Sequence, residues 1–306
     1  MLTKEPFEKK CRNKIFYNSA REAFYELLKQ IDLKQDEYIL MPSYIGQSLK
    51  EGSGVFDPIR RLKLNYKFYK LNALLNINFK DIELQCNKYK IKVIFIIHYF
   101  GILQPQIEEL SSFCKKNNII LIEDCAHTFI QNNLQVGDYG DFAIFSIHKC
   151  CPTQYGGILK INNIQSLNIN NFKSVIDNSS LLTYSELDFK LIKQKRRTNF
   201  QHYLNNIKEN EYLKLFYTDL DINANPLNFP ILIEKLDRFE IYKKLVNYNI
   251  PVVSLWYKLI DEIDIEFYKN THDISSKILN LPVHQDIDFD DINYILEKLN
   301  KVCKNA

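Results

Sequence analysis

The sequence is that of a globular protein with a nearly balanced charge. It has 306 residues, of which 46% are apolar and 25% charged, and these fractions exclude a disordered or collagen-like chain. Lys and Arg number 40 against 37 Asp and Glu. The resulting net charge of +3 is too small for a protein whose main task is to neutralise nucleic-acid phosphates. At roughly 150 residues per domain, the length predicts about two domains.

Neither a secretory leader nor a membrane span is expected. The N-terminal stretch MLTKEPFEKKCRNK lacks the apolar core of a secretory signal. The longest strongly apolar run is Val93–Ile97, far shorter than the roughly 20 residues that a spanning helix requires. The seven cysteines are irregularly spaced and form no CxxC pair, which favours a reduced, cytoplasmic protein.

Residues 1–190 are predicted to form a large α/β domain with a mainly parallel sheet. Ser19 or Asn18 can cap a helix over 18–30, and residues 106–117 have the apolar stripe of a second helix. Continuous apolar runs predict buried strands at 37–41, 92–99, 119–123, 142–145 and 158–161. Buried strands that alternate with amphipathic helices are typical of a parallel sheet covered on both faces.

Residues 191–306 are predicted to form a smaller C-terminal α/β domain. Before it, the Asn- and Ser-rich stretch 162–186 is predicted to be a loop. The expected helices are 187–204, 234–249 and 288–302, and the expected strands are 229–233, 252–256 and 277–281.

Polar side chains follow two of the predicted strands. Asp124 comes directly after IILIE, with His127 three residues later, and Ser146 and Lys149 come after FAIF. Polar residues just past the carboxyl ends of such strands are often functional. Taken alone, Asp124 is better explained by a cap or an ion pair, and His127 by a satisfied polar residue. The structural alternative for Lys149 is a surface lysine. A desolvated lysine in this place would be a usable amine nucleophile.

A third feature is the helix start at residues 18–21. The first turn after Ser19 offers backbone N–H groups and a positive dipole end, which together suit a phosphate. A plain capped helix is the simpler interpretation of this feature by itself. In combination, a phosphate-binding helix start, a strand-end carboxylate and a strand-end lysine are the groups that pyridoxal phosphate requires.

These stretches resemble the DegT/DnrJ-type aminotransferases, the sugar aminotransferase branch of the fold-type I pyridoxal phosphate enzymes. The resemblance is carried by NSAREAFYELLK, DEYILMPSY, VIFIIHYFG, NNIILIEDCAHT, GDYGDFAIFSIHK with the following YGG, NFPILI and ILNLPVHQD. It implies an aminotransferase that uses pyridoxal phosphate and moves an amino group from a donor such as glutamate onto a keto-sugar linked to a nucleotide. It also implies a homodimer. The balanced charge and the short apolar runs predict that neither nucleic acid nor a membrane is a partner.

The resemblance assigns three residues to catalysis. Lys149 corresponds to the lysine that forms the Schiff base and carries the proton between substrate carbon and cofactor carbon. Asp124 corresponds to the partner of the pyridine nitrogen. His127 stands where the family has Gln or His near the phenolic oxygen of the cofactor.

Five positions are assigned to cofactor binding alone. Ser146 corresponds to a phosphate ligand, and Ser19, Ala20 and Arg21 stand where the backbone of the helix start meets the phosphate. Tyr44 lies near the position of the aromatic residue that covers the pyridine ring.

Two departures from the family pattern leave an alternative open. The Ser-x-x-Lys spacing is shorter than in many members, and no Gly-Tyr-Asn loop is found within 162–186. A non-catalytic or dehydratase-like protein of the same fold, which binds cofactor or sugar, is therefore the second hypothesis. Dehydratase-like members replace the lysine with histidine, so Lys149, preceded by His148, favours transamination.

Other sites are weaker. A nicotinamide site is excluded because no GxGxxG turn is present. A zinc site from His148, Cys150 and Cys151 is set aside, because adjacent cysteines lack the usual ligand spacing, and no metal is expected. The basic cluster of residues 195–197 is interpreted as a solvated helix face, with a contact to a substrate pyrophosphate as the alternative. His284 is a further, weaker candidate for the site.

Overall fold

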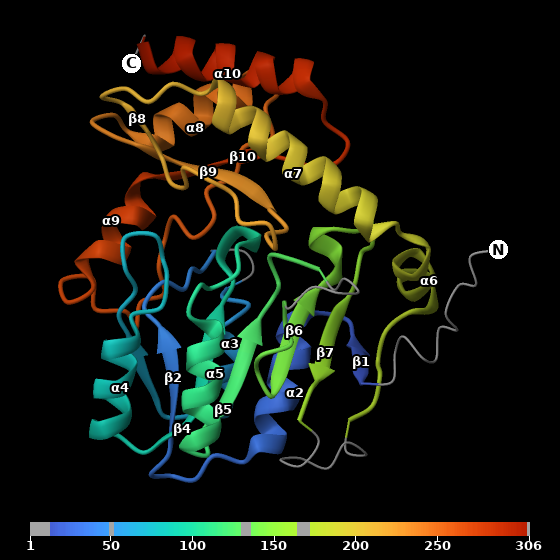
Figure 1. Cartoon of the computed structure of the whole chain (residues 1–306), viewed down its shortest axis with the longest axis vertical. Coiled ribbons are helices and arrows are strands. Elements are labelled where there is room, and N and C mark those ends of the chain that lie inside the picture. The colour runs from blue at the N-terminus through green and yellow to red at the C-terminus, as the bar shows by residue number, and fades with distance from the viewer. Residues whose placement is uncertain (1–12, 49–51, 130–135, 164–171, 305–306) are drawn as a thin grey trace.

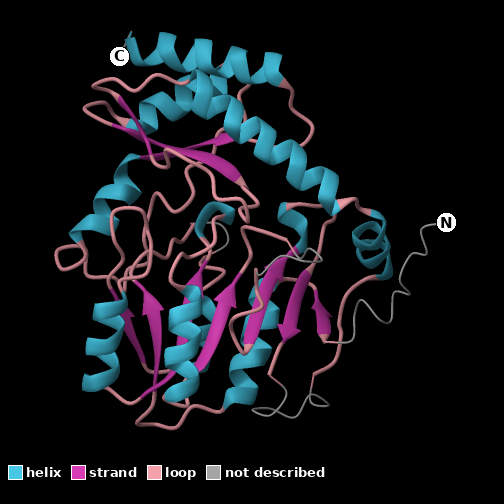
Figure 2. Ribbon diagram, viewed as in Figure 1, coloured by secondary structure: helices cyan, strands magenta, loops and turns pink. Residues whose placement is uncertain are grey.

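The computed structural model describes residues 13–48, 52–129, 136–163 and 172–304. They form a large sheet and a small sheet, each accompanied by helices (Figures 1 and 2). Within the described residues no helix is long and apolar enough to cross a membrane.

The large sheet has seven strands in the order β1-β7-β6-β5-β4-β2-β3. They are β1 (Lys14–Tyr17), β2 (Tyr38–Pro42), β3 (Tyr66–Tyr69), β4 (Ile91–Ile97), β5 (Ile120–Asp124), β6 (Phe142–Ser146) and β7 (Gly157–Ile161). Neighbouring strands from β3 to β6 run parallel, whereas β7 is antiparallel to both β6 and β1. The predicted mainly parallel sheet is thus confirmed.

Helices of this part pack their apolar stripes against the sheet. They are α2 (Ala20–Ile31), α3 (Asp57–Leu62), α4 (Phe79–Lys88) and α5 (Ile107–Lys116). In α2 the buried residues recur at helical spacing, and the Ser19 hydroxyl accepts the Glu22 N–H at 3.1 Å, so Ser19 is the N-cap. The short 3₁₀ turns η1 (Tyr99–Gly101) and η2 (Ile147–Lys149) follow β4 and β6 directly.

The second sheet is antiparallel, in the order β10-β9-β8. Its strands are β8 (Leu213–Leu215), β9 (Asn228–Ile233) and β10 (Ile278–Pro282), and the helices of this half are α6 (Asn178–Glu186), α7 (Phe189–Asn206), α8 (Arg238–Asn247), α9 (Lys269–Lys277) and α10 (Phe289–Lys304). Helices α7, α8 and α10 share a core with this sheet that includes Phe200, Phe229, Ile241 and Leu299.

The two halves are closely joined. Helix α7 runs from the side of the large sheet toward the small one (Figure 1). Leu259, Ile260, Ile263 and Ile274 lie late in the chain but belong to the core of the large sheet. The division into residues 1–190 and 191–306 therefore stays a prediction.

Two predictions of local structure are wrong. Residues 252–256 form no strand beyond one isolated bridge from Val253 to Asn280, because Trp256 takes a left-handed backbone with φ 61°. The stretch predicted as a loop contains α6, which begins because Asp177 accepts the N–H of Ser180 at 2.9 Å. Residues 164–171 of that stretch lie outside the described part of the chain.

Candidate active site

The two predicted strand ends lie side by side. β5 and β6 are parallel neighbours, and Asp124, the last residue of β5, is in register with Ile144 of β6. β6 ends two residues later at Ser146, and η2 then ends at Lys149. The carboxyl edge of the sheet thus gathers a carboxylate, a hydroxyl and an amine that the sequence separates by up to 25 positions.

Asp124 is a buried carboxylate with one local donor. It is 6% exposed, and its Oδ1 accepts the N–H of Ala126 at 2.8 Å. Burial raises the pKa of Asp124, while the nearby charge of Lys149 and the Ala126 N–H oppose that rise. A carboxylate in this state favours a cationic partner at the end of the strand.

His127 is held as a neutral ring. Its Nδ1 accepts the N–H of Phe100 at 3.1 Å, which leaves the ring proton on Nε2. Burial, and then the charge of Lys149, lower the pKa of His127 well below its usual value. The ring centroids of Phe100 and Trp256 lie 6.2 Å and 5.3 Å from that of the imidazole, so His127, Phe100 and Trp256 form an aromatic wall.

The helix start and the end of β6 also meet. Ser146 pairs with Gly157 of β7, and the Gly156 N–H donates to the carbonyl oxygen of Asn18 at 2.8 Å. A Cβ on Gly157 would lie 2.2–2.4 Å from backbone atoms of Ser19 and Ala20. Glycine is therefore required for β7 to lie directly against the first turn of α2.

Arg21 contributes its backbone, and not its side chain, to the first turn of α2. Its side chain leaves the turn and lies 3.6 Å from Asp57 of α3 in a largely exposed ion pair. The predicted role of Arg21 concerns its backbone N–H, which the side-chain pair does not occupy.

The side chain of Tyr44 is buried beside the candidate site and packs against other aromatic rings. It is completely buried, its hydroxyl donates to the Leu255 carbonyl oxygen at 3.2 Å, and burial raises its pKa. Its ring centroid is 5.6 Å from that of Tyr99 and 5.7 Å from that of Trp256. The role of Tyr44 over a cofactor ring stays a prediction.

Trp256 packs against His127 and was not singled out by the sequence analysis. A Cβ at Gly46 would lie 2.3–2.4 Å from the Trp256 side chain, so the glycine after Tyr44 makes room for the indole. Ser275 donates to the Trp256 carbonyl oxygen at 2.9 Å and holds the left-handed turn. The usable signal in the sequence was a single tryptophan in 306 residues.

Glu123, next to Asp124, was also missed, and it orders the layer behind the site. Its carboxylate accepts the N–H groups of Gly137, Tyr139 and Gly140 and faces His98 Nε2 at 2.8 Å. The His98 Nδ1 accepts a further N–H, from Gln104, at 3.1 Å. Together with Cys125 these side chains lie within metal-ligand distance of one another, but the oxygens and nitrogens already have hydrogen-bond partners, so we assign them a structural role.

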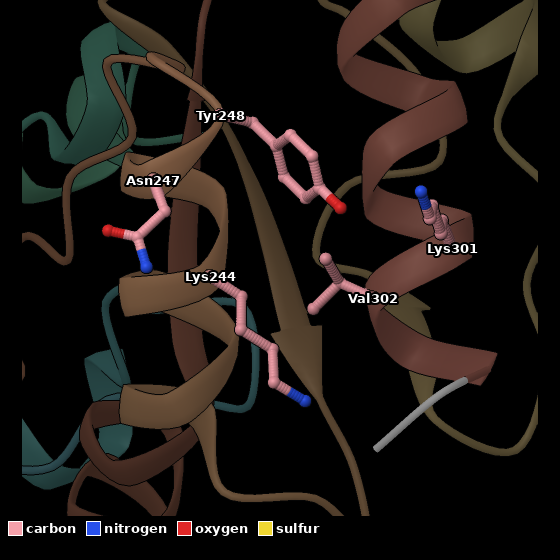
Figure 3. A pocket seen from close by; sticks show the side chains of 5 residues that line it. All are labelled: Lys244, Asn247, Tyr248, Lys301 and Val302. Carbon is pink, nitrogen blue, oxygen red and sulfur yellow. The ribbon is translucent and has the colours of Figure 1, made fainter.

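A pocket of about 320 Å³ lies elsewhere, between α8 and α10 (Figure 3). It is lined by Lys244, Asn247, Tyr248, Lys301 and Val302. This set brings no nucleophile together with an acid or a base, and we assign the pocket no part in the chemistry.

Comparison with known proteins identifies the family. The model of the DegT/DnrJ/EryC1/StrS aminotransferase family matches residues 9–165, just over half of the chain. The chain belongs to this family. The predicted family is confirmed, and with it membership of a group of pyridoxal phosphate-dependent aminotransferases.

Two curated relatives of this DegT/DnrJ/EryC1/StrS family member are sugar transaminases. The dTDP-4-amino-4,6-dideoxy-D-glucose transaminase of Shigella dysenteriae is 24% identical in an alignment of 249 residues, and the match covers 69% of this chain and 66% of the relative. The UDP-4-amino-4,6-dideoxy-N-acetyl-beta-L-altrosamine transaminase of Campylobacter jejuni is 24% identical in an alignment of 281 residues, and the match covers 76% of this chain and 71% of the relative. The match to the Shigella enzyme thus spans just under two thirds of that enzyme's length.

Solved structures confirm the fold of the family member. Helicobacter pylori PseC, an aminotransferase, superposes with a TM-score of 0.80 at 19% identity and covers 98% of this chain and 90% of its own. The sugar aminotransferase Spr1654 of Streptococcus pneumoniae gives 0.79 at 15% identity and covers 99% and 93%. The predicted class, fold-type I with a large parallel-sheet domain and a smaller unit, is correct.

The side chains of the family member fit pyridoxal phosphate. The buried Asp124, with its raised pKa, is suited to a protonated ring nitrogen, and Lys149 supplies an amine at the same edge of the sheet. The close approach that Gly157 permits brings Ser146 and the start of α2 together, and a hydroxyl beside a helix N-terminus would suit the phosphate of this cofactor.

The His127→Gln variant is expected to flatten the pH dependence of stability below about pH 6.5. The folded protein keeps His127 neutral, whereas the unfolded chain binds its proton near pH 6.5. The unfolded state then holds more protons, so the free energy of unfolding of the wild type falls as the pH falls, by up to about 1.4 kcal/mol per pH unit for this group.

Urea unfolding between about pH 7.5 and 5.5 measures this difference. The exposed His272 provides the matched control, and His272→Gln should keep the wild-type slope. If His127→Gln kept that slope as well, the buried neutral state of His127 would be wrong.

Proposed function

We propose that this chain is a pyridoxal phosphate-dependent aminotransferase that transfers an amino group from a donor such as glutamate onto a nucleotide-linked keto-sugar. One observation carries the proposal. Asp124 and Lys149 lie at the ends of neighbouring strands, close enough for the charge of the lysine to act on the carboxylate, with the start of α2 beside them. Because the chain belongs to an aminotransferase family, we interpret this arrangement as an amino-transfer site.

The acceptor class follows from the relatives. The names of the two curated transaminases both place an amino group on carbon 4 of a 4,6-dideoxy sugar attached to a nucleotide. The acceptor of such a reaction carries a carbonyl at that carbon. We therefore propose that the acceptor of this chain is a nucleotide-linked 4-keto-6-deoxy sugar. We also propose that the enzyme is a cytoplasmic homodimer.

Each residue of the site has a part in the mechanism. Bound pyridoxal phosphate supplies an electron sink that is conjugated to the amino nitrogen of the substrate. Lys149 Nζ would hold the cofactor through its amine and would be the group that takes and returns the proton at the substrate carbon. Asp124 would keep a proton on the ring nitrogen, and Ser146 together with the first turn of α2 would hold the phosphate.

The aromatic wall orients the His127 ring and excludes water from one side of the site. His127 is neutral and offers its Nε2–H as a donor beside Asp124. Trp256 lies against the imidazole and keeps water from that side of the site. The alternative of a non-catalytic or dehydratase-like protein is not favoured, because the lysine that dehydration-type members lack lies next to the strand-end carboxylate.

The test is a spectrum of the purified protein with added pyridoxal phosphate, before and after L-glutamate. We expect a visible band from lysine-bound cofactor that glutamate removes and a 4-keto sugar nucleotide restores. A band that ignores every amino donor would support the non-catalytic alternative. The absence of any band would contradict the proposal as a whole.

A further inference from the structure

A smaller pocket lies at the carboxyl edge of the large sheet, beside the first turn of α9. It has a volume of about 160 Å³. This volume is about ten times the space that a single buried water requires, so it admits a phosphate group with part of the molecule that carries it. Two lysines, Lys70 and Lys269, are among the described residues that line the pocket, and no carboxylate is. A lining with positive charge and no acid favours an anion.

The sheet places two of the lining residues side by side. Ser43 directly follows β2, and Lys70 directly follows β3. These strands are parallel neighbours in which Pro42 is in register with Tyr69. The Ser43 N–H donates to the Tyr69 carbonyl oxygen at 3.0 Å, which fixes the serine at this edge. Ligands of α/β proteins commonly bind outside the carboxyl ends of such strands.

The Ser43 hydroxyl is buried without a partner. The residue is 0% exposed, and its Oγ has no hydrogen-bond partner among the described residues. Buried hydroxyl groups are paired in the large majority of cases, so this one requires an explanation. Because Ser43 lines the pocket, a ligand with acceptor oxygens in the pocket would supply the partner.

The first turn of α9 offers backbone N–H groups to the same space. Its N-cap is Tyr268, which makes no capping bond and whose hydroxyl instead donates to the Phe68 carbonyl oxygen at 3.1 Å. The Thr271 hydroxyl donates to the Tyr268 carbonyl oxygen at 2.9 Å, so it caps no N–H either. The leading N–H groups of this nine-residue helix therefore remain for a ligand at the positive end of the helix dipole.

Lys70 supplies a charge that no acid of the described chain neutralises. Its Nζ lies 4.4 Å from the ring centroid of Phe267, another lining residue, and forms no ion pair with a described carboxylate. Two neighbouring acids are already bonded to backbone N–H groups. Asp81 accepts the Lys70 N–H at 2.7 Å, and Asp264 accepts those of Glu266 and Phe267.

We propose that this pocket binds a phosphate group of a small ligand. The oxygens of a phosphate can accept from a hydroxyl, from helix N-terminal N–H groups and from a lysine at the same time, and the pocket brings these three kinds of donor together. A carboxylate has only two oxygens and would reach fewer of them. In the sheet, β4 separates β2 from β5, which carries Asp124, so the inference does not depend on the proposed function.

The first experiment measures the Tm and the Kd for inorganic phosphate. It uses the holoenzyme freed of excess pyridoxal phosphate, so that the cofactor fills its own phosphate position. Potassium chloride at equal ionic strength is the reference, because exposed lysines respond to salt. We expect phosphate to raise the Tm of the wild type above the chloride value. Ser43→Ala and Lys70→Met should each raise the phosphate Kd about 10-fold or more.

Two further variants are matched controls. Lys116→Met removes an exposed lysine of α5, and Ser111→Ala removes a buried hydroxyl that donates to the Tyr139 carbonyl oxygen at 2.6 Å. Both should keep the wild-type Kd for phosphate. Without ligand, Ser111→Ala should lower Tm because a buried hydrogen bond is lost, whereas Ser43→Ala should keep or raise it. A marked drop in Ser43→Ala would mean that the hydroxyl serves the fold, and would contradict the proposal.

UDP is the second probe, because its terminal phosphate has the same chemistry on a larger molecule. If UDP raises Tm where free phosphate does not, and Lys70→Met abolishes the effect, the pocket takes the phosphate of a nucleotide. If neither probe exceeds chloride, or if Ser43→Ala and Lys70→Met respond to both probes as the wild type does, the proposal is overturned. Loss of amino transfer with an unchanged phosphate Kd would contradict the proposed function alone.

Discussion

The Lys149→Ala variant is expected to lose the visible cofactor band and at least about 1,000-fold in transamination rate. Lys149 ends η2, directly after β6, so its amine stands at the same edge of the sheet as Asp124. The charge of Lys149 also acts on both His127 and Asp124, as expected of an amine that faces the candidate site. Removal of the side chain leaves no amine to bind the cofactor or to carry the proton.

The control is Lys116→Ala, which removes an exposed lysine from the last turn of α5. It should keep both the band and the rate. Far-ultraviolet circular dichroism of both variants verifies the fold. A Lys149→Ala protein that retained the band would mean that a different amine binds the cofactor.

The central part of the site was predictable from the sequence for a physical reason. Each of β5 and β6 is a continuous apolar run, because both faces of the strand are covered. A polar residue that ends such a run has to lie at the carboxyl edge of the sheet. Asp124 and Ser146 could therefore be brought together before the order of the strands was known.

Shorter elements gave a weaker signal. Strands β1 and β3 have four residues each, of which only two are buried, so neither shows a continuous apolar run. Pattern alone also does not fix strand direction: β7 returns antiparallel to β6 after a ten-residue connection that ends at Gly156, whose φ is 145°, and Gly157 then pairs with Ser146.

The residues that the sequence hid are those that depend on distant partners. Trp256 reaches the site because Gly46, far away in the sequence, leaves space for the indole. Arg196 lies on a largely polar helix, which predicts a solvated face, but the turn at 284–287 covers it. Asn199, one turn later, donates to the carbonyl oxygens of His284 and Ile287 in that turn. Local pattern carries no information about such packing.

The Asp124→Asn variant is expected to bind pyridoxal phosphate about 10- to 100-fold more weakly and to react at least about 100-fold more slowly. Asn cannot stabilise a proton on the ring nitrogen as a carboxylate does, so the electron sink is lost. Cofactor affinity can be measured by quenching of Trp256, the single tryptophan of the chain, whose ring lies 5.3 Å from that of His127.

Stability should change in the opposite direction to function in this variant. Because burial raises the pKa of Asp124, the charged carboxylate is disfavoured in the folded protein at neutral pH. Asn removes that charge and keeps an oxygen for the Ala126 N–H, so the Tm without cofactor should be equal or higher. Asp141→Asn is the control. Asp141 directly precedes β6 and accepts the Leu121 N–H at the amino edge of the sheet, away from the carboxyl ends of the strands, so this variant should leave cofactor affinity unchanged. An Asp124→Asn protein that lost stability without cofactor and kept its affinity would show that Asp124 serves the fold rather than the cofactor.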